Sequence, residues 1–364
     1  MVTSKLSSYL VIACTITTVL LVLSFRSYGP ALPLRSLSIQ PSSSAPLSKS
    51  SNFKSAYPKA SLDTTSEIGR VSNSTLGFQK VFVLSLEERT DKRDAFVLGA
   101  SLTGFGVEFI AGLKGDKLSD KARPPGLKLV DGSYGAWRTH MNAISRIIQD
   151  NLATAFIMED DVDWDIRLLS QLPDFAKGVR SLSGISPSQT QYSPYGDDWD
   201  VLWPGHCGDY LPENDKRLYV IENDETVAPT AQQPWLTTLK DMPEHTRIVH
   251  KAGAPICTFG YAVSYRGAQK ILMGLGVKGG QNMAFDNSLA FLCRDGYLDM
   301  KCYSVEPQLF HHHRPAGSVN KDSDINGGAS DIVREKGNTE VMIYSARLNL
   351  EQLITGSQEY TMQW

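Results

Sequence analysis

Four carboxylates fall within five residues at the end of a short apolar run. Ala155–Met158 is followed by Glu159, Asp160 and Asp161, and then by Asp163. Side chains two apart on extended backbone share a face. Glu159 with Asp161, or Asp161 with Asp163, can therefore bind one hard divalent cation through oxygen ligands. The alternative is a solvated acidic turn at the end of a buried strand.

A second group of potential metal ligands is the histidine run His311–His313, which holds three of the seven histidines of the chain. The apolar residues before it indicate a strand, and alternation places His311 and His313 on one face. Imidazole beside carboxylates makes a mixed nitrogen and oxygen site suited to Mn²⁺. A surface histidine cluster is the alternative.

Two arginines could bind a diphosphate. Arg89 and Arg93 are four residues apart, so they share one face of a helix, and a guanidinium pair suits phosphate oxygens. Ordinary surface pairing with Glu88 or Asp91 is the alternative.

Two further side chains have both a structural and a chemical interpretation. His140 follows Gly135 near the start of a predicted helix, where it is either a ligand contact or a packed core histidine beside Ile144. Asp286 begins another amphipathic helix, where it is either an N-cap or a catalytic base.

The elements that must position these residues begin with a strand over Val81–Leu86. Apolar residues at helical spacing up to Thr103 predict a helix, which Gly104 ends, and Val107–Ile110 reads as a second strand. Strand, helix and strand within about thirty residues form the βαβ unit of an open parallel sheet. Ligands collect at the carboxyl ends of such strands, so the residues just after Leu86 are expected to face a ligand.

Further elements are expected downstream. They are a strand over Asp198–Gly205, a long polar loop over 208–245, a strand over Ile256–Ser264 and a helix over Arg266–Leu275.

The N-terminal quarter of the chain has a different character. After a short tail over residues 1–5, the uncharged apolar stretch 6–25 is long enough to span a hydrocarbon core, and we expect a retained anchor rather than a cleaved signal peptide. Residues 26–76 are rich in Ser and Pro, which predicts a disordered stalk. Asn73 lies in an N-glycosylation sequon at its end.

The remaining residues have a globular composition. We expect a catalytic domain over 77–330 and a C-terminal extension over 331–364 that contains an amphipathic helix within 342–354. The formal net charge of -3 argues against a nucleic-acid partner. Outside the apolar stretch there are four cysteines without CxxC spacing, which form two disulfides in an oxidising lumen or stay as unpaired core thiols.

These segments together resemble glycosyltransferase family 25, which holds lipopolysaccharide and collagen galactosyltransferases. The matching pieces occur in the family's order across residues 78–326. They are Val81–Leu86 with Arg89 and Arg93, Gly135–His140, Phe156–Asp161, Asp198–Gly205, Gly260–Ser264 and Asp286. The chain has Thr139-His140 where the family usually has Ser-His, and Ser85-Leu86 where it usually has Asn-Leu.

The resemblance implies an α/β fold of the GT-A type, a Rossmann-like mixed sheet flanked by helices. It implies an inverting transfer of a galactose-type sugar from a UDP-sugar donor to a glycan or glycoprotein acceptor, with Mn²⁺ or Mg²⁺ across the donor diphosphate. Asp286 would be the catalytic base, and Glu159 and Asp161 would bind the metal. Asp160 would contact the donor ribose or the metal.

By their position and spacing, Arg89, Arg93 and His140 would contact the donor. By analogy with other GT-A enzymes, His311 or His313 would complete the metal coordination. The layout of anchor, stalk and head is that of a single-pass type II membrane protein of the Golgi or endoplasmic reticulum, with its catalytic domain in the lumen. A metal-dependent phosphoesterase and a non-catalytic sugar-binding protein are the rival interpretations.

Overall fold

The computed structural model describes residues 62–364, apart from 125, 234, 280–281 and 326–330. The predicted tail, the anchor over 6–25 and most of the stalk therefore lie outside the described residues. Within the described part of the chain, no helix combines the length and the apolar character needed to cross a membrane.

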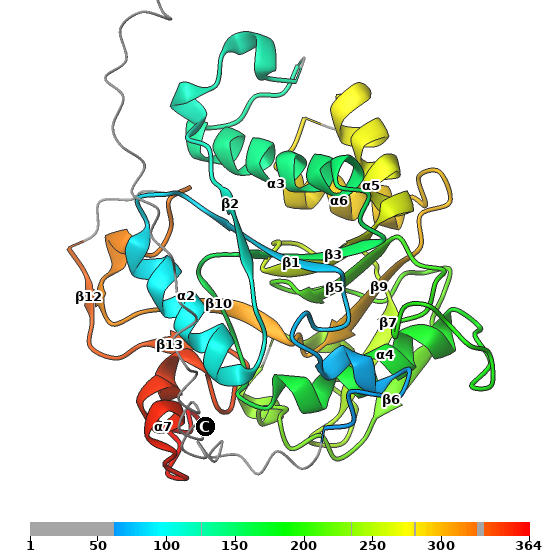
Figure 1. Ribbon diagram of the computed structural model, residues 1–364, viewed down its shortest axis with the longest axis vertical. Helices are drawn as coiled ribbons and strands as arrows, with labels where there is room; N and C mark the ends of the chain where they lie inside the picture. The colour runs from blue at the N-terminus through cyan, green and yellow to red at the C-terminus, as the bar shows by residue number, and fades with distance from the viewer. Residues whose placement is uncertain (1–61, 125, 234, 280–281, 326–330) are drawn as a thin grey trace, which may run out of the picture. The chain divides into compact units, whose positions relative to one another are not determined.

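A mixed eight-stranded sheet forms the centre of the described residues, in the order β2-β1-β3-β8-β5-β9-β7-β6 (Figure 1). Its strands are β1 Lys80–Ser85, β2 Glu108–Ala111, β3 Thr154–Glu159, β5 Val201–Gly205, β6 Leu218–Ile221, β7 Arg247–Lys251, β8 Gly260–Ser264 and β9 Cys302–Glu306. β1 pairs in parallel with β2 and β3, and β5 pairs in parallel with β9, whereas β8 and β7 run antiparallel to their neighbours. The carboxyl ends of β1, β3, β5 and β9 therefore share one edge of the sheet.

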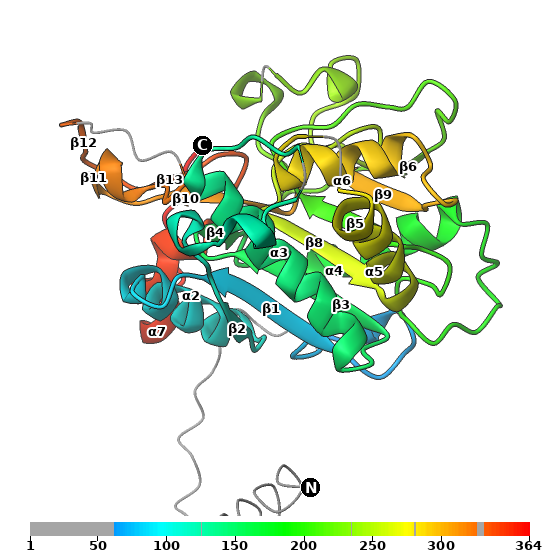
Figure 2. The same cartoon turned by 90° about the horizontal axis from the view of Figure 1, so that it is seen from above.

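Helices cover both faces of this sheet. They are α2 Thr90–Thr103, α3 Asp131–Gln149, α4 Leu168–Leu182, α5 Tyr265–Ile271 and α6 Phe285–Arg294, with a π-helical turn over Leu272–Val277. The short helix α7 Leu350–Thr355 packs against α2 instead. Short 3-10 helices are η1 Gly69–Ser72, η2 Gly115–Lys117, η3 Asp120–Ala122, η4 Thr230–Gln232, η5 Thr237–Leu239, η7 Val319–Lys321 and η8 Arg347–Asn349. α3, α5 and α6 lie on one face, and α2 and α4 lie on the other (Figures 1 and 2).

Alternation along the strands builds a core on each face. In β1, Val81 and Val83 pack with α2 and α4, whereas Phe82 and Leu84 pack with α3 and α6. The strand is buried on both faces, as expected for a strand between two helical layers. The predicted βαβ unit is confirmed by β1, α2 and β2, and Gly104 ends α2 in the left-handed region with φ 96°.

A small sheet adjoins the carboxyl end of β3. It has the order β13-β10-β4, with β4 Val162–Trp164, β10 Phe310–Arg314 and β13 Asn338–Thr339. A separate two-stranded sheet pairs β11 Gly317–Ser318 with β12 Val333–Arg334. The acidic run thus passes from β3 through a turn into β4, which pairs antiparallel with the histidine strand β10.

The predicted stalk does not continue to residue 76. Val71 and Leu76 are 0% and 1% exposed, and the Ser72 hydroxyl donates to the Leu169 carbonyl oxygen of α4 at 2.8 Å. The few apolar residues of this segment pack on the domain, although the average composition of the longer stretch is that of a disordered chain. The globular part therefore begins before residue 77.

The C-terminal segment is likewise part of the domain rather than an extension of it. Only Leu350–Thr355 forms the α-helix α7, which is shorter than the amphipathic helix predicted within 342–354. Thr339 and Ser345 are fully buried beside β4 and β10. Their polar partners in the acidic strand, described below, explain why this segment packs inward.

Four cysteines form two disulfides, as the even count allowed. Cys207 pairs with Cys257, and Cys293 pairs with Cys302. The first joins the end of β5 to the segment that precedes β8, next to the edge where the parallel strands end.

Candidate functional site

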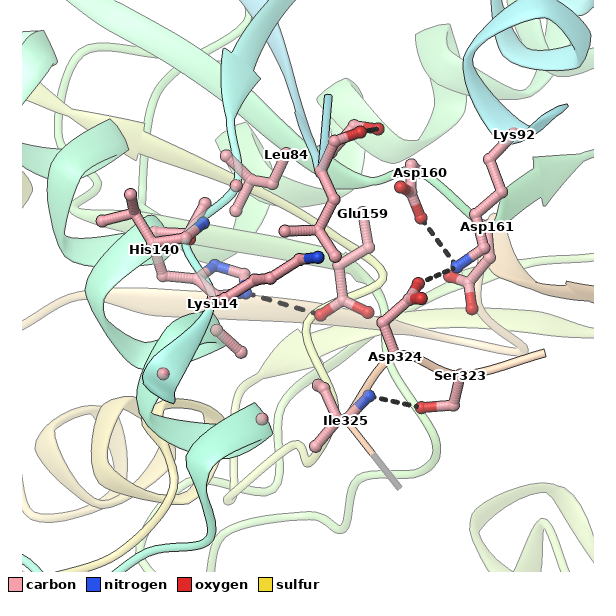
Figure 3. A pocket seen from close by; sticks show the side chains of 18 of the residues that line it. Leu84, Lys92, Lys114, His140, Glu159, Asp160, Asp161, Ser323, Asp324 and Ile325 are labelled. Atoms are coloured by element: carbon pink, nitrogen blue, oxygen red, sulfur yellow. Dashed lines mark hydrogen bonds and ion pairs between the residues drawn. The ribbon is translucent and has the colours of Figure 1, made fainter. Parts of the chain in front are cut away.

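A cavity of about 390 Å³ lies at the carboxyl ends of β1 and β3, between the first turns of α2 and α3 (Figure 3). Its lining comes from five places in the chain that the fold brings together. These are the end of β1 into α2 (Leu84, Ser85, Leu86, Glu88, Lys92), the loop after β2 (Gly112–Asp116), the start of α3 (Asp131, Gly132, Ala136, Thr139, His140), the acidic turn (Glu159, Asp160, Asp161) and a C-terminal segment (Ser323, Asp324, Ile325). This is the edge at which open α/β sheets bind ligands.

Glycine and threonine fix the wall formed by α3. A Cβ at Gly135 would collide with the Leu113 carbonyl oxygen, so only glycine lets the loop after β2 lie directly on the helix. The Thr139 hydroxyl donates to the Gly135 carbonyl oxygen at 2.8 Å and accepts from the Leu113 amide at 2.9 Å. A serine hydroxyl could make the same two bonds, which is why the change from Ser-His to Thr139-His140 preserves this wall.

Glu159 is held at the base of the cavity by a hydrogen-bonded network. It accepts from the Thr258 hydroxyl at 2.7 Å and lies 3.5 Å from Nε2 of His140. The other ring nitrogen of His140 lies 2.9 Å from the Tyr261 hydroxyl, and the ring stacks on Phe285 at 4.5 Å between centroids. Burial opposes ionisation of Glu159, but the His140 and Thr258 contacts lower its pKa below the ordinary value. His140 is therefore both a packed histidine and a residue of the cavity lining.

Asp160 is paired with a lysine that was missing from the predicted site. Lys92 Nζ lies 3.0 Å from Oδ1 of Asp160 and 3.0 Å from Oδ2 of Asp324. Burial nevertheless raises the pKa of Asp160 above its ordinary value. Lys92 lies in the first turn of α2, three residues beyond the N-cap Arg89. Helical spacing alone does not distinguish it from the other basic residues of this run.

Asp161 is the most electrostatically strained carboxylate of the turn. Burial, together with the neighbouring charges of Glu159 and Asp160, raises its pKa to about 6, although Lys92 and Arg314 oppose the rise. Its contact with Arg314 is long, at 3.3 Å. The ionised form of Asp161 would therefore be stabilised by any additional positive charge that enters the cavity.

Asp163 has a structural role. It is fully buried and accepts hydrogen bonds from the amides of Trp164 (2.8 Å) and Arg347 (3.1 Å). It also accepts from the hydroxyls of Thr339 (2.6 Å) and Ser345. The interpretation in which Asp163 shares a cation with Asp161 is therefore wrong, because its oxygens are already occupied by the C-terminal segment.

The histidine strand does not complete a metal site with the acidic turn. Nδ1 of His313 lies 2.8 Å from the Thr339 hydroxyl, and the ring of His311 packs on Phe259 at 5.0 Å between centroids. Neither histidine is among the residues that line the cavity, and burial lowers the pKa of each to about 4. Of the predicted metal ligands, Glu159 and Asp161 therefore line the cavity together, whereas His311 and His313 do not line it. Across the described ranges of the chain, no group of three or more His, Cys, Asp or Glu side chains is placed to hold a metal ion.

The two predicted arginines lie beside the cavity rather than in its lining. Arg89 bonds to Asp91 at 3.0 Å, to the Lys321 carbonyl oxygen at 3.0 Å and to Asp324. Arg93 stacks over the Phe109 ring at 4.4 Å from the centroid. Arg89 therefore reaches the cavity only through Asp324, and Arg93 is used in packing.

Asp286 lies in the first turn of α6 and anchors the segment before β8. One carboxylate oxygen accepts from the Cys257 amide at 3.0 Å, and the other accepts from Asn287 at 3.2 Å. Cys257 has φ 64° and precedes Thr258, which binds Glu159. Asp286 is not among the residues that line the cavity. Its hydrogen bond to the Cys257 amide positions the turn that carries Thr258.

The charges of the lining constrain what the cavity can bind. Seven carboxylates and two lysines line it, so an anionic ligand would meet a strongly negative wall. Magnesium-type cations in such sites are usually bound by one or two carboxylates together with substrate phosphates, rather than by a complete protein cage. Asp160 and Asp161, with raised pKa values and oxygen ligands, fit that arrangement.

Comparison with known proteins gives distant relatives. No family model matches the chain. Procollagen galactosyltransferase 1 of Danio rerio is 22% identical over 273 residues, which cover 68% of this chain and 39% of that protein. A glycosyltransferase 25 family member of Anopheles gambiae is 22% identical over 224 residues, which cover 58% of this chain and 31% of that protein. Procollagen galactosyltransferase 2 of Homo sapiens is 22% identical over 273 residues, with 68% and 37% covered.

The matches span less than two fifths of each relative's own length. One of the three carries the name of the family that the ordered sequence motifs indicated, and the other two are named procollagen galactosyltransferases. The predicted resemblance is thereby confirmed, and the chain is similar to members of glycosyltransferase family 25.

Proposed function

We propose that this chain is a glycosyltransferase that moves a galactose-type sugar from a UDP-sugar to a hydroxyl group of a glycan or glycoprotein, with inversion at the sugar carbon. One observation carries the proposal. A cavity at the carboxyl ends of β1 and β3 has the crowded carboxylates of Asp160 and Asp161 in its wall, in a chain whose relatives include procollagen galactosyltransferases.

The carboxylate wall supports a cation-dependent donor site. Mn²⁺ or Mg²⁺ would be held by Asp160 and Asp161 together with the donor diphosphate. When bound, such a cation neutralises the charge that develops on the leaving UDP. The neutral histidines His311 and His313 lie outside this site and have no part in the proposal.

The remaining lining residues would position the donor. The network of Glu159, His140 and Thr258 holds the base of the cavity rigid, which keeps the reacting groups in place without reorganisation. Leu84, Leu86 and Ile325 supply apolar surface on which part of the donor can pack and from which water is excluded.

We assign the general base to Asp286. In the proposed reaction its carboxylate accepts the proton from the acceptor hydroxyl as that oxygen bonds to the sugar carbon and the bond to UDP breaks. Two properties support the assignment: it is part-exposed in the first turn of α6, and it connects through Cys257 and Thr258 to Glu159.

The cellular setting is part of the proposal. Two disulfides suit an oxidising compartment. We propose a single-pass type II protein of the Golgi or endoplasmic reticulum membrane, anchored by residues 6–25, with the domain in the lumen.

The test is UDP release by the full chain. UDP-galactose and UDP-glucose are supplied with a glycopeptide acceptor, in Mn²⁺ and in excess chelator. We expect release in Mn²⁺ only, and we expect Asp286→Asn to lower kcat by roughly 10² to 10⁴-fold. Asp174→Asn, in an exposed pair with Lys177 on α4, is the matched control and should behave as wild type. Full turnover in chelator, or full turnover by Asp286→Asn, would refute the corresponding assignment.

A further inference from the structure

Asp324 is an acidic side chain that lies against the cationic residues beside the proposed donor site. Its carboxylate is bound by Lys92 at 3.0 Å and by Arg89, and it lines the same cavity as Asp160 and Asp161 (Figure 3). The Lys92 and Arg89 side chains are only 11% and 14% exposed, whereas that of Asp324 is 35% exposed. The Lys92 and Arg89 side chains are therefore held in place by the domain, and Asp324 is the more accessible partner.

The segment 321–325, which we call the strap, holds Asp324 across the cavity. Its first residue accepts from Arg89 through the Lys321 carbonyl oxygen at 3.0 Å, and Asp322 pairs with Arg334 at 2.8 Å. At the other end, a Cβ on Gly132 would lie 2.6 Å from the Ile325 carbonyl oxygen, so the strap packs directly on the first turn of α3. The strap thus runs from the start of α2 to the start of α3, over the carboxyl end of β1.

A carboxylate between a guanidinium and an ammonium group has the same partners that a phosphate group has in proteins. Asp324 also adds negative charge to a wall that already holds six other carboxylates. An ion pair whose carboxylate is part-exposed contributes little to stability. A ligand phosphate with more negative charge can therefore displace Asp324 at small cost.

We propose that Lys92 and Arg89 form an anion subsite for a phosphate group of the donor, and that Asp324 occupies this subsite in the free protein. This rests on the proposed function and deepens it by naming the residues that bind the diphosphate. Donor binding then requires that the Asp324 carboxylate leave Lys92 and Arg89. Lys92, which also contacts Asp160, places the phosphate next to the acidic turn.

The competing interpretation is that Asp324 is a permanent structural partner of the two cations. The two interpretations predict different changes in UDP affinity when the charge of Asp324 is removed. Removing the charge of Asp324 frees the subsite if the acid competes with phosphate, and it leaves binding unchanged or weaker if the acid only holds the strap in place.

The experiment is calorimetric titration of the full chain with UDP and with uridine, both in Mn²⁺. We expect Asp324→Asn to tighten UDP binding roughly three- to fivefold, since the loss of a competing ion pair worth up to about 1 kcal/mol corresponds to a factor of at most about five. Uridine has no phosphate and should bind Asp324→Asn and wild type equally. Lys92→Gln should weaken UDP binding about tenfold or more with little effect on uridine. Asp174→Asn is the matched control for the loss of one surface carboxylate.

The possible results separate the two levels of the proposal. If wild type binds UDP and Asp324→Asn binds it equally or more weakly, Asp324 does not occupy a phosphate subsite and the inference is overturned. Equal tightening for UDP and uridine would also overturn it, because that would reflect a wider cavity rather than a freed anion site. If wild type binds neither UDP nor uridine, the proposed function fails together with the inference. Unchanged thermal unfolding of Lys92→Gln confirms that its weaker binding is not due to misfolding.

Discussion

At the scale of single residues, two acids that are two positions apart have opposite roles. Asp161 faces the cavity with a pKa raised to about 6, whereas Asp163 is fully buried under four hydrogen bonds. Both belong to the same acidic run, and alternation alone would have placed them on the same face. The difference arises because the chain turns between β3 and β4, so the two side chains meet different partners.

This difference gives the first prediction. Asp163→Asn should lower the free energy of unfolding by about 2–4 kcal/mol, because it removes a buried charge whose donors are then left imperfectly paired. Asp161→Asn should unfold at or above the wild-type temperature, since it removes a charge that burial and neighbouring carboxylates disfavour. Thermal unfolding measured in chelator distinguishes them, and an equal loss of stability in both variants would contradict these roles.

A second prediction concerns the buried acid Glu306 at the end of β9. It is fully buried, accepts from the Asp209 amide at 3.2 Å, contacts Thr238 and lies 3.8 Å from His250. Burial, with a contribution from the Asp209 charge, raises the pKa of Glu306 to about 7. The folded protein therefore binds this proton more tightly than the unfolded chain does, and the contribution of Glu306 to stability falls as the pH rises from about 4.5 to about 7.

Glu306→Gln removes this dependence. The unfolding free energy of wild type minus that of Glu306→Gln should fall by up to about 3 kcal/mol over that pH range and then stay level. Urea unfolding at several pH values measures the difference, in which the unchanged neighbours Asp209 and His250 largely cancel. A difference that rises with pH would contradict the assignment.

At the scale of elements, the C-terminal segment acts as the support of the acidic turn. Arg347 donates to the carbonyl oxygens of Asp160 at 2.8 Å and of Val162 at 3.1 Å, and its amide binds Asp163. The backbone that positions the cavity carboxylates is therefore fixed by residues nearly two hundred positions away.

The third prediction follows from this support. Arg347→Met leaves two carbonyl groups of the turn without a donor, and we expect a loss of about 2–4 kcal/mol of stability together with weaker UDP binding in Mn²⁺. Glu351→Ala, on the exposed side of α7, is the matched control in the same segment. Normal UDP affinity in a folded Arg347→Met protein would show that the turn does not depend on this segment.

The two disulfides close loops of different length. Cys207 and Cys257 are separated by 50 residues, and Cys293 and Cys302 are separated by 9. The chain-entropy description gives about 4 kcal/mol for the longer loop and about 2.6 kcal/mol for the shorter one. We therefore expect the Cys207→Ser, Cys257→Ser double variant to lose more stability than the Cys293→Ser, Cys302→Ser double variant.

The longer disulfide should also affect activity. Cys257 donates to Asp286 and precedes Thr258, which holds Glu159. Loss of the bond should lower kcat for UDP release under conditions where the protein stays folded, while loss of the shorter disulfide should not. Chemical unfolding and UDP release measured on both double variants check the two parts separately, and an equal kcat in both would contradict the link to the site.

At the scale of the whole molecule, the sequence was enough to predict the elements that carry strong local patterns. The β1–α2–β2 unit, the strand that ends at Glu159 and the helices that contain His140 and Asp286 all occur near their predicted positions. Their signals are local, because apolar spacing and glycine stops act within one element. The edge of the sheet where the cavity lies followed from the parallel pairing of β1 with its neighbours.

The contacts that the sequence could not supply are all long-range. Lys92 was passed over in favour of Arg89 and Arg93 because helical spacing does not show which member of a basic run meets Asp160. The strand that holds the histidines was predicted correctly, and β10 does pair with the acidic strand β4. The hydrogen-bond partner of the His313 ring, however, is Thr339 of β13. Likewise, no local sequence pattern indicates that the Ser345 hydroxyl donates a hydrogen bond to Asp163. Side-chain direction in these places is decided by tertiary partners.

The central claim is that the acidic turn holds a cation against a diphosphate. The most direct measurement is the electron paramagnetic resonance signal of free Mn²⁺, titrated with the full chain in the presence and absence of UDP. We expect wild type with UDP to remove Mn²⁺ from solution far more strongly than either UDP or protein alone, and Asp161→Asn to lose most of this effect while Asp174→Asn keeps it. Equal Mn²⁺ uptake by wild type and Asp161→Asn, or uptake that UDP does not change, would contradict the claim.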